Sequence, residues 1–368
     1  MIAGKHTSWK NLFASRTGVI MTGVVIGIVA TLLQKFGNPP NMGICVACFT
    51  RDTAGALGLH RAEVVQYLRP EILGIIVGAT LAALLAGEFK ARAGSVSFIR
   101  FMLGAWAMIG ALVFLGCPWR TLLRIAGGDL NAVIGLGGLV AGIWLATRCF
   151  VSGYDPGPSR QSSPIVGWAW PLLVLAALGL VMAFPPVAGQ ARSGLLFYSV
   201  KGPGSMHAPL WLSLASGVVI GGLLQRSRFC TIGGFRDWIL FRQTHLLWGT
   251  LGLVVAAAVM NLLLRQCTPG FHGQPIAHTM ALWNFLGMTL AGLAFTLAGG
   301  CPGRQCVLAG EGDADAATVV CGMLVGAAFA HNFALAGSPQ GVGTNGQIAV
   351  VVGLIFCGLL GICLRAKK

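Results

Sequence analysis

Two pentapeptides decide how this sequence folds: GCPWR at residues 116–120 and GCPGR at residues 300–304. In each, the proline cannot continue the preceding apolar helix but suits the first position of a new one, so the cysteine lies at a helix break. Twelve residues after its first glycine, each pentapeptide is followed by the pattern G-D-x-x-A. The motif therefore occurs twice, at an offset of 184 residues.

A second pair of segments repeats in the same order. Residues 45–52 read CVACFTRD and residues 230–237 read CTIGGFRD, so both follow the pattern C-x5-R-D at an offset of 185. Two motifs at nearly the same offset indicate an internal duplication. Five long apolar stretches separate equivalent positions, and an odd number inverts the second copy relative to the first. We therefore expect two oppositely oriented repeats whose cysteine-bearing segments meet near mid-membrane, forming an hourglass with a constriction.

The composition is that of an integral membrane protein. Only 10% of the 368 residues are charged, whereas 55% are hydrophobic; ordinary globular proteins have about 25% charged residues. A soluble fold needs more charge to cover its surface, so soluble, disordered and secreted disulfide-rich classes are excluded. The net charge of +15 is explained by basic loops that face the cytoplasm, and no nucleic-acid partner is expected. The predicted fold class is an all-α polytopic membrane protein in contact with the lipid bilayer.

About ten long spans and four short re-entrant helices are predicted. A helix needs roughly 20 apolar residues to cross the bilayer, and the candidate spans are 17–36, 70–87, 97–116, 129–150, 167–184, 208–225, 245–264, 281–300, 315–335 and 346–364. Four segments are too short to cross and suit re-entrant helices, which transporters use to build their sites: 43–60, 118–128, 230–243 and 302–311.

These segments divide the chain into five parts. We expect a cytoplasmic N-terminal tail, a first repeat, a linker with an extra span, a second repeat, and a final span with a basic tail, at residues 1–16, 17–150, 151–207, 208–340 and 341–368. The loops on the side of the N-terminus carry about twice as many Lys and Arg residues as the opposite loops, which predicts that both termini are cytoplasmic.

The pentapeptides combine three features that suit a soft anion. The start of each short helix offers unpaired N–H groups and a partial positive charge. Arg120 and Arg304 add permanent charge, and Cys117 and Cys301 add a polarizable sulfur. These residues indicate a pathway for a small sulfur- or selenium-bearing anion.

The repeated R-D pairs have separate roles. For Arg51 and Arg236 we expect a position at the mouths of the pathway, because ionisable groups inside a membrane are functional candidates. For the aspartates that follow them we expect structural pairing.

Other cysteines leave alternatives open. Cys45 and Cys48 form a C-x-x-C pair, which is compatible with a thiol–disulfide redox protein or with a metal-ion permease that uses Cys ligands. Cys306 has no counterpart in the first repeat, where Leu122 takes its place, and is a candidate for an additional substrate-contacting thiol. No nucleotide-binding, hydrolase or metalloprotease motif occurs, so we expect no enzymatic activity, no cofactor and no resident metal.

These cysteine-bearing segments and the stretch GGCPGRQC at residues 299–306 resemble the YeeE/YedE sulfur-transport family, most closely its YedE branch, which is assigned to selenium transport. The resemblance extends from the first span to the ninth. It implies an hourglass-shaped carrier in the bacterial inner membrane that takes up a species such as thiosulfate. By position it implies a relay of Cys45, Cys117 and Cys301, with Cys230 completing the symmetry and Cys48 as an alternative to Cys45. It also implies a cytoplasmic sulfurtransferase-like partner.

Overall fold

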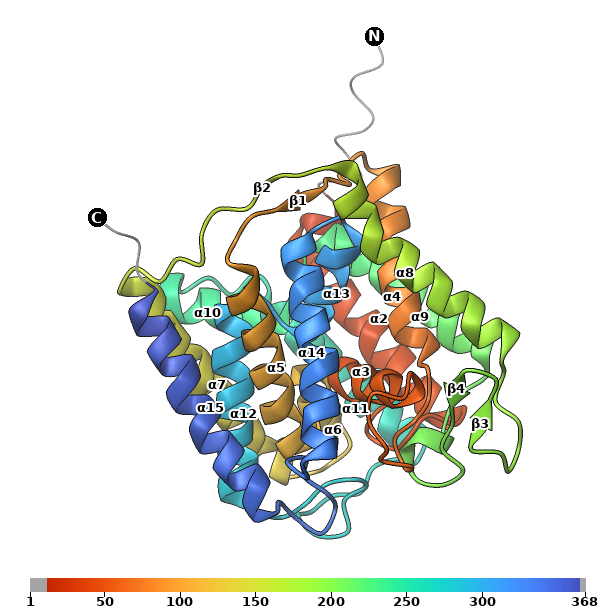
Figure 1. Ribbon diagram of the computed structural model, residues 1–368. Coiled ribbons are helices and arrows are strands. Elements are labelled where there is room, and N and C mark those ends of the chain that lie inside the picture. The colour runs from red at the N-terminus through yellow and green to blue at the C-terminus, as the bar shows by residue number, and fades with distance from the viewer. Residues whose placement is uncertain (1–11, 365–368) are drawn as a thin grey trace.

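The protein is an all-α polytopic membrane protein in the computed structural model, which describes residues 12–364 (Figure 1). Within these residues lie ten helices of 16 to 21 residues: α2 (Arg16–Lys35), α4 (Pro70–Leu85), α5 (Ser97–Phe114), α7 (Asn131–Val151), α8 (Pro164–Ala183), α9 (Leu210–Ser227), α11 (Leu247–Leu263), α12 (Ala281–Leu297), α14 (Ala314–Asn332) and α15 (Thr344–Cys363). Four further helices of 9 to 11 residues are α3 (Val46–Ala56), α6 (Pro118–Ala126), α10 (Thr231–Phe241) and α13 (Pro302–Gly310).

The predicted fold class is confirmed. Each predicted span overlaps one long helix, with ends that differ by at most three residues, and each predicted re-entrant segment contains one short helix. In the described part of the chain, seven helical segments are long and apolar enough to cross a membrane. Two further helices, α4 and α11, are apolar but shorter, so the number of spans stays a prediction.

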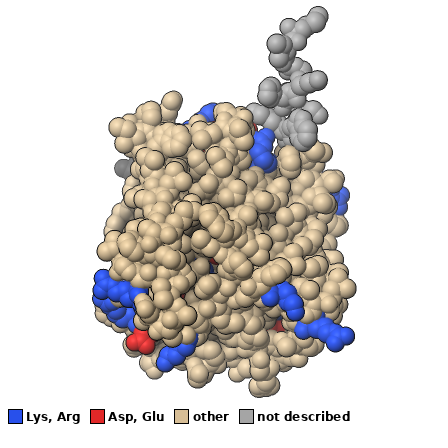
Figure 2. Space-filling view, turned by 90° about the vertical axis from the view of Figure 1, so that its right-hand side faces the viewer, with Lys and Arg blue, Asp and Glu red and all other residues tan. Residues whose placement is uncertain are grey.

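The surface carries its charge at two ends. In Figure 2 an almost uncharged band separates Lys and Arg side chains at the upper and lower ends of the molecule. Many large apolar side chains are exposed, such as Leu85 and Ile165 at 89% and 80%. An apolar band between charged ends is the surface that a bilayer requires.

The helices repeat in order and invert in space. From α2 to α7 their lengths run long, short, long, long, short, long, and the same order returns from α9 to α14. Figure 1 shows α3 and α6 in the lower half of the molecule and α10 and α13 in the upper half. The first described helix begins, and the last ends, on the same upper side (Figure 1). The expected terminal tails fall mostly outside the described residues, and the division into five parts stays a prediction.

Glycines show that the helices of one half pack against those of the other. Gly138 of α7 lies so close to the carbonyl group of Phe285 in α12 that no side chain fits between them. Gly322 of α14 has the same relation to the carbonyl group of Phe101 in α5. Both the glycines and the phenylalanines are 184 positions apart, so the two contacts are related by an approximate two-fold axis. Small residues let membrane helices approach this closely.

Two pairs of very short strands, which the sequence analysis did not predict, join the loops. Strand β1 (Arg92–Ala93) pairs antiparallel with β2 (Arg160–Gln161), and β3 (Arg192–Ser193) with β4 (Leu196–Phe197). The first pair connects the α4–α5 loop to the linker before α8, and the second closes the loop after α8. They fix loops at opposite ends of the molecule (Figure 1).

Candidate functional site

Each of the four short helices begins at a cysteine. Cys45, Cys117, Cys230 and Cys301 are the N-cap residues of α3, α6, α10 and α13. In α3, α10 and α13 the sulfur accepts a hydrogen bond from a backbone N–H of the first turn, at 3.3 to 3.4 Å. A cap oxygen of Ser or Asp normally takes this place. The four sulfurs therefore lie at the positive ends of four short helices.

The cysteines form one pair in each half. The Sγ atoms of Cys45 and Cys117 lie 3.6 Å apart, within hydrogen-bond distance for sulfur. In the second half the backbone N–H of Cys301 donates to the Sγ atom of Cys230 at 3.4 Å. Cys45, Cys117 and Cys301 are at most 1% exposed, and Cys230 is 6% exposed. Both pairs are closed off from solvent.

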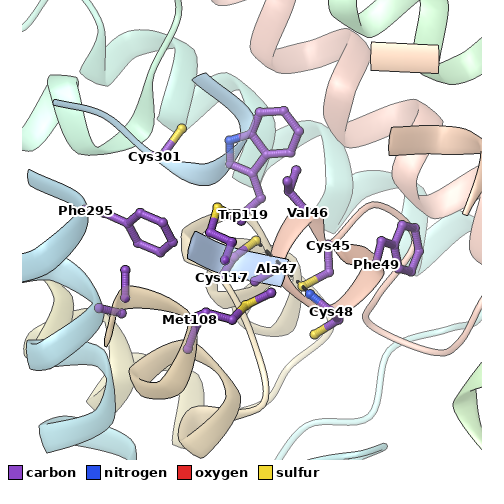
Figure 3. Packing of buried hydrophobic residues seen from close by; sticks show 14 of the residues in the cluster. Cys45, Val46, Ala47, Cys48, Phe49, Met108, Cys117, Trp119, Phe295 and Cys301 are labelled. Carbon is purple, nitrogen blue, oxygen red and sulfur yellow. Dashed lines mark hydrogen bonds between the residues drawn. The ribbon is translucent and has the colours of Figure 1, made fainter. Parts of the chain in front are cut away.

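The two pairs approach each other at the centre of the molecule. Cys117 caps α6 in the first half, and Cys301 caps α13 in the second half. Between the helices that they cap, the ring of Trp119 packs against Gly303, and Figure 3 shows Trp119 near Cys117 and Cys301. Positions 119 and 303 are equivalent in the two repeats, and equivalent positions can touch only near the axis that relates the repeats. This contact therefore marks the midpoint of the protein.

Arg120, one of the predicted site residues, is fully buried in the first half. Its guanidinium donates to the backbone oxygens of Leu115 and, at 3.0 Å, Ile276, and it contacts the Sγ atom of Cys48 at 3.7 Å. A buried guanidinium needs several acceptors to offset the loss of water, and carbonyl groups supply most of them here. The Arg120 guanidinium thus contacts a thiol, and no carboxylate among the described residues pairs with it.

Arg304, the counterpart of Arg120, lies in a different environment. It contacts the carboxylate of Glu311 at 3.4 Å, and the same carboxylate pairs with Arg228 at 2.7 Å and Arg92 at 3.5 Å. The Glu311 side chain is only 4% exposed. These residues form an ion network beside the Cys230–Cys301 pair, because Arg228 precedes Cys230 by two positions and Arg304 follows Cys301 by three.

The network continues to the surface through Glu88, which follows α4. Its carboxylate pairs with Arg226 at 3.1 Å and with Arg228 at 2.7 Å, and it accepts a hydrogen bond from Gln225. Partial burial acts to raise the pKa of Glu88. The hydrogen bond from Gln225 and the charges of the two arginines outweigh it and lower the pKa below its ordinary value.

The aspartates of both R-D pairs form ion pairs with arginines, as expected for a structural role. Asp52 pairs with its neighbour Arg51 at 2.7 Å and with Arg69 at 2.7 Å, and all three side chains are buried. Asp237 pairs with Arg236 at 2.8 Å on a partly exposed surface. Arg51 is thus enclosed by protein, whereas Arg236 is accessible; a role for either at the pathway mouths stays a prediction.

Cys306 is fully buried in α13, five residues after Cys301, and its role stays a prediction. Trp119, Gly303 and Glu311 were not predicted from the sequence. The signal for the first two was available, since positions 119 and 303 are where GCPWR and GCPGR differ. Glu311 had no such signal, because Gly127 takes its place in the first repeat.

These features define a class: a polytopic membrane protein made of two inverted helical halves, with short helices that start at buried thiols in its centre. The chain belongs to the sulphur transport family, whose family model matches residues 3–145 and 226–362. The resemblance to the YeeE/YedE family is therefore confirmed, while the selenium branch stays a prediction.

Two curated relatives share part of the sequence. The chain is 30% identical over 103 residues to the thiosulfate transporter TsuA of Spirochaeta thermophila, which covers 28% of this chain and 31% of the relative. It is 30% identical over 107 residues to the thiosulfate transporter TsuA of Escherichia coli, which covers 29% and 30%. The chain thus matches less than a third of the length of each relative.

Proposed function

We propose that this protein is an uptake transporter for a small sulfur- or selenium-containing anion, with thiosulfate as the first candidate. The observation that carries the proposal is the arrangement of four buried cysteines as two pairs, one in each inverted half. The family likeness and the names of the two relatives support thiosulfate over other sulfur anions.

Transport needs no covalent step in this proposal. An anion that enters the first half meets Cys45 and Cys117, whose S–H groups donate weak hydrogen bonds to its sulfur. It then crosses to Cys301 and Cys230 in the second half. The positive ends of the four helices lower the cost of moving a negative charge through the membrane interior, and Arg120 adds a full positive charge on the first side.

We further propose the bacterial inner membrane as the location, with both termini in the cytoplasm. The excess of Lys and Arg in the loops on the terminal side supports this orientation, in which the first pair of cysteines faces outward and the second inward. A cytoplasmic sulfurtransferase-like protein is the proposed acceptor, on the basis of family resemblance.

Uptake of labelled thiosulfate into proteoliposomes tests the proposal. We expect Cys117→Ala and Cys301→Ala to lower uptake by about tenfold each, the equivalent of one lost hydrogen bond of roughly 1.4 kcal/mol. Cys357→Ala is the matched control, because Cys357 is equally buried but lies in α15, and it should retain uptake. A parallel assay with selenite distinguishes the two substrate classes.

The outcomes separate the proposal from its alternatives. If neither thiosulfate nor selenite enters vesicles with the unaltered protein, the substrate assignment is wrong. A thiol–disulfide enzyme that uses the Cys45–Cys48 pair would lose all turnover in Cys45→Ser, whereas a polar contact site would keep part of its uptake. A metal permease would instead bind zinc or copper and lose that metal in Cys301→Ala.

A further inference from the structure

The ring of Trp119 lies at the crossing between the two halves. It belongs to the first turn of α6, two residues after Cys117, and it packs against Gly303, two residues after Cys301. A Cβ atom at Gly303 would approach the Cζ2 and Cη2 atoms of the ring to 3.0 and 3.1 Å. Gly303 therefore leaves space that a single large ring fills from the opposite repeat.

The polar edge of this ring has no partner. Trp119 is 2% exposed, and its Nε1 atom forms no hydrogen bond within the described residues. A buried N–H group without an acceptor is normally avoided, because it loses its bonds to water and gains nothing in return. In Figure 3 the nitrogen of the ring faces the side on which Cys301 lies. The N–H group is thus a buried donor whose hydrogen bond no described residue accepts.

An oxoanion of sulfur presents two kinds of acceptor. Thiosulfate has a soft terminal sulfur, which suits contact with a thiol, and harder oxygens, which suit an N–H donor. At the crossing, the thiols of Cys117 and Cys301 can contact the soft sulfur of the anion. Of these three residues, only Trp119 has an N–H group that can donate to its oxygens.

We propose that Trp119 is a substrate-contacting residue that selects oxoanions at the midpoint of the pathway. Its indole N–H donates a hydrogen bond to an oxygen of the anion as the sulfur of that anion moves from Cys117 to Cys301. This inference rests on the proposed function, whose cysteine pathway it completes. The contact comes from one repeat only, because its counterpart is Gly303.

The test compares two conservative substitutions. Trp119→Phe removes the N–H group and keeps an aromatic ring. Trp106→Phe is the matched control, because Trp106 also has a buried Nε1 atom without a partner, but it lies in α5 against Phe356. Thiosulfate binding to each purified variant is measured by calorimetry, and tryptophan emission is recorded during the same titration.

We expect Trp119→Phe to bind thiosulfate about tenfold more weakly, the effect of one lost hydrogen bond, and to lose the emission change caused by thiosulfate. Trp106→Phe should match the unaltered protein in both measurements. Equal affinity of the two variants, or an unchanged emission response in Trp119→Phe, would overturn the inference. Failure of the unaltered protein to bind thiosulfate would overturn it as well.

A second variant covers the case in which Trp119→Phe does not fold. Gly303→Ala keeps the indole but displaces its ring, and it should weaken binding, whereas Gly179→Ala in α8 should not, because a Cβ atom there meets nothing within 4 Å. Normal binding by Gly303→Ala would contradict the inference. The uptake assay separates the two proposals: uptake that Trp119→Phe leaves unchanged refutes the role of Trp119 and leaves the transport function standing. Binding that depends on Trp119, without uptake by the unaltered protein, refutes transport and leaves the contact standing.

Discussion

The close approach of the two halves can be tested at Gly138 and Gly322, which are equivalent positions in α7 and α14. A Cβ atom would lie 2.8 Å from the carbonyl carbon of Phe285 at Gly138, and 2.9 Å from that of Phe101 at Gly322. Ordinary carbon–carbon contacts start near 3.5 Å, and the carbonyl oxygen of each phenylalanine lies closer still to the added atom. Each pair of helices must therefore separate by about 1 Å to admit an alanine. The obstacle is backbone, which cannot rotate away.

We expect Gly138→Ala and Gly322→Ala to destabilise the protein by similar amounts. Overpacking costs about 1–3 kcal/mol, and the upper part of this range applies because backbone must move. The higher helix propensity of alanine offsets up to about 1 kcal/mol of this cost. The net loss is therefore about 2 kcal/mol for each variant, seen as a lower melting temperature when helical circular dichroism is followed in detergent.

Two glycines in the same fold provide controls. Gly179 in α8 and Gly358 in α15 have no atom within 4 Å of an added Cβ, so alanine there should leave the melting temperature unchanged or raise it slightly. A Gly138→Ala variant that melts no lower than Gly179→Ala would contradict the close approach of the helices. A lower melting temperature for only one of the two variants would also contradict it, because the two-fold relation requires both glycines to be closely packed.

Three further predictions concern charges and buried amides. Glu311→Gln should lower stability by about 2 kcal/mol in detergent melting, less than the 3–5 kcal/mol of a fully buried pair because Arg228 is partly exposed; a melting curve equal to that of the unaltered protein would contradict this. For Glu88 the lowered pKa means that the ion pairs stabilise the fold above about pH 4.3, the ordinary Glu pKa, and that this contribution is lost as the pH falls through the lower folded-state value. The stability difference between the unaltered protein and Glu88→Gln should therefore shrink in acid, and a difference that grows there would be inconsistent with the pairing. Asn38 is 1% exposed, donates to the carbonyl of Gly43 at 2.8 Å and accepts from the N–H of Ala208 at 2.8 Å. Asn38→Ala should therefore cost about 1–3 kcal/mol by leaving these buried backbone groups unpaired, and unfolding measurements that find no loss would contradict this.

The order of the helices could be predicted from the sequence because the signals that start and end each helix are local. A run of apolar residues ends at the proline of each pentapeptide, and this places Cys117 and Cys301 at helix starts. Cys45 and Cys230 occupy the same position in α3 and α10, but no proline marks those starts, so their role as caps could not be predicted from the residues.

The features that could not be predicted are contacts between segments that lie far apart in the sequence. The place of Trp119 at the midpoint depends on its contact with Gly303. That residue lies 184 positions away in the sequence, and the two-fold relation brings the two together. Glu311 pairs with Arg304 of the helix that it caps, and with Arg92 and Arg228 from two distant segments. No spacing in the sequence predicts that these two segments meet at Glu311. The two-residue strands are too short to leave an alternating pattern.

The packing of each half against helices of the other half has a consequence for biosynthesis. Helices α5 and α7 find their tightest partners in α14 and α12, which the ribosome makes more than a hundred residues later. Until then, the glycine-lined faces of the newly inserted first half are covered only by lipid. We expect the first half, expressed alone, to remain loosely assembled and sensitive to membrane proteases, and co-expression of the missing half to rescue it.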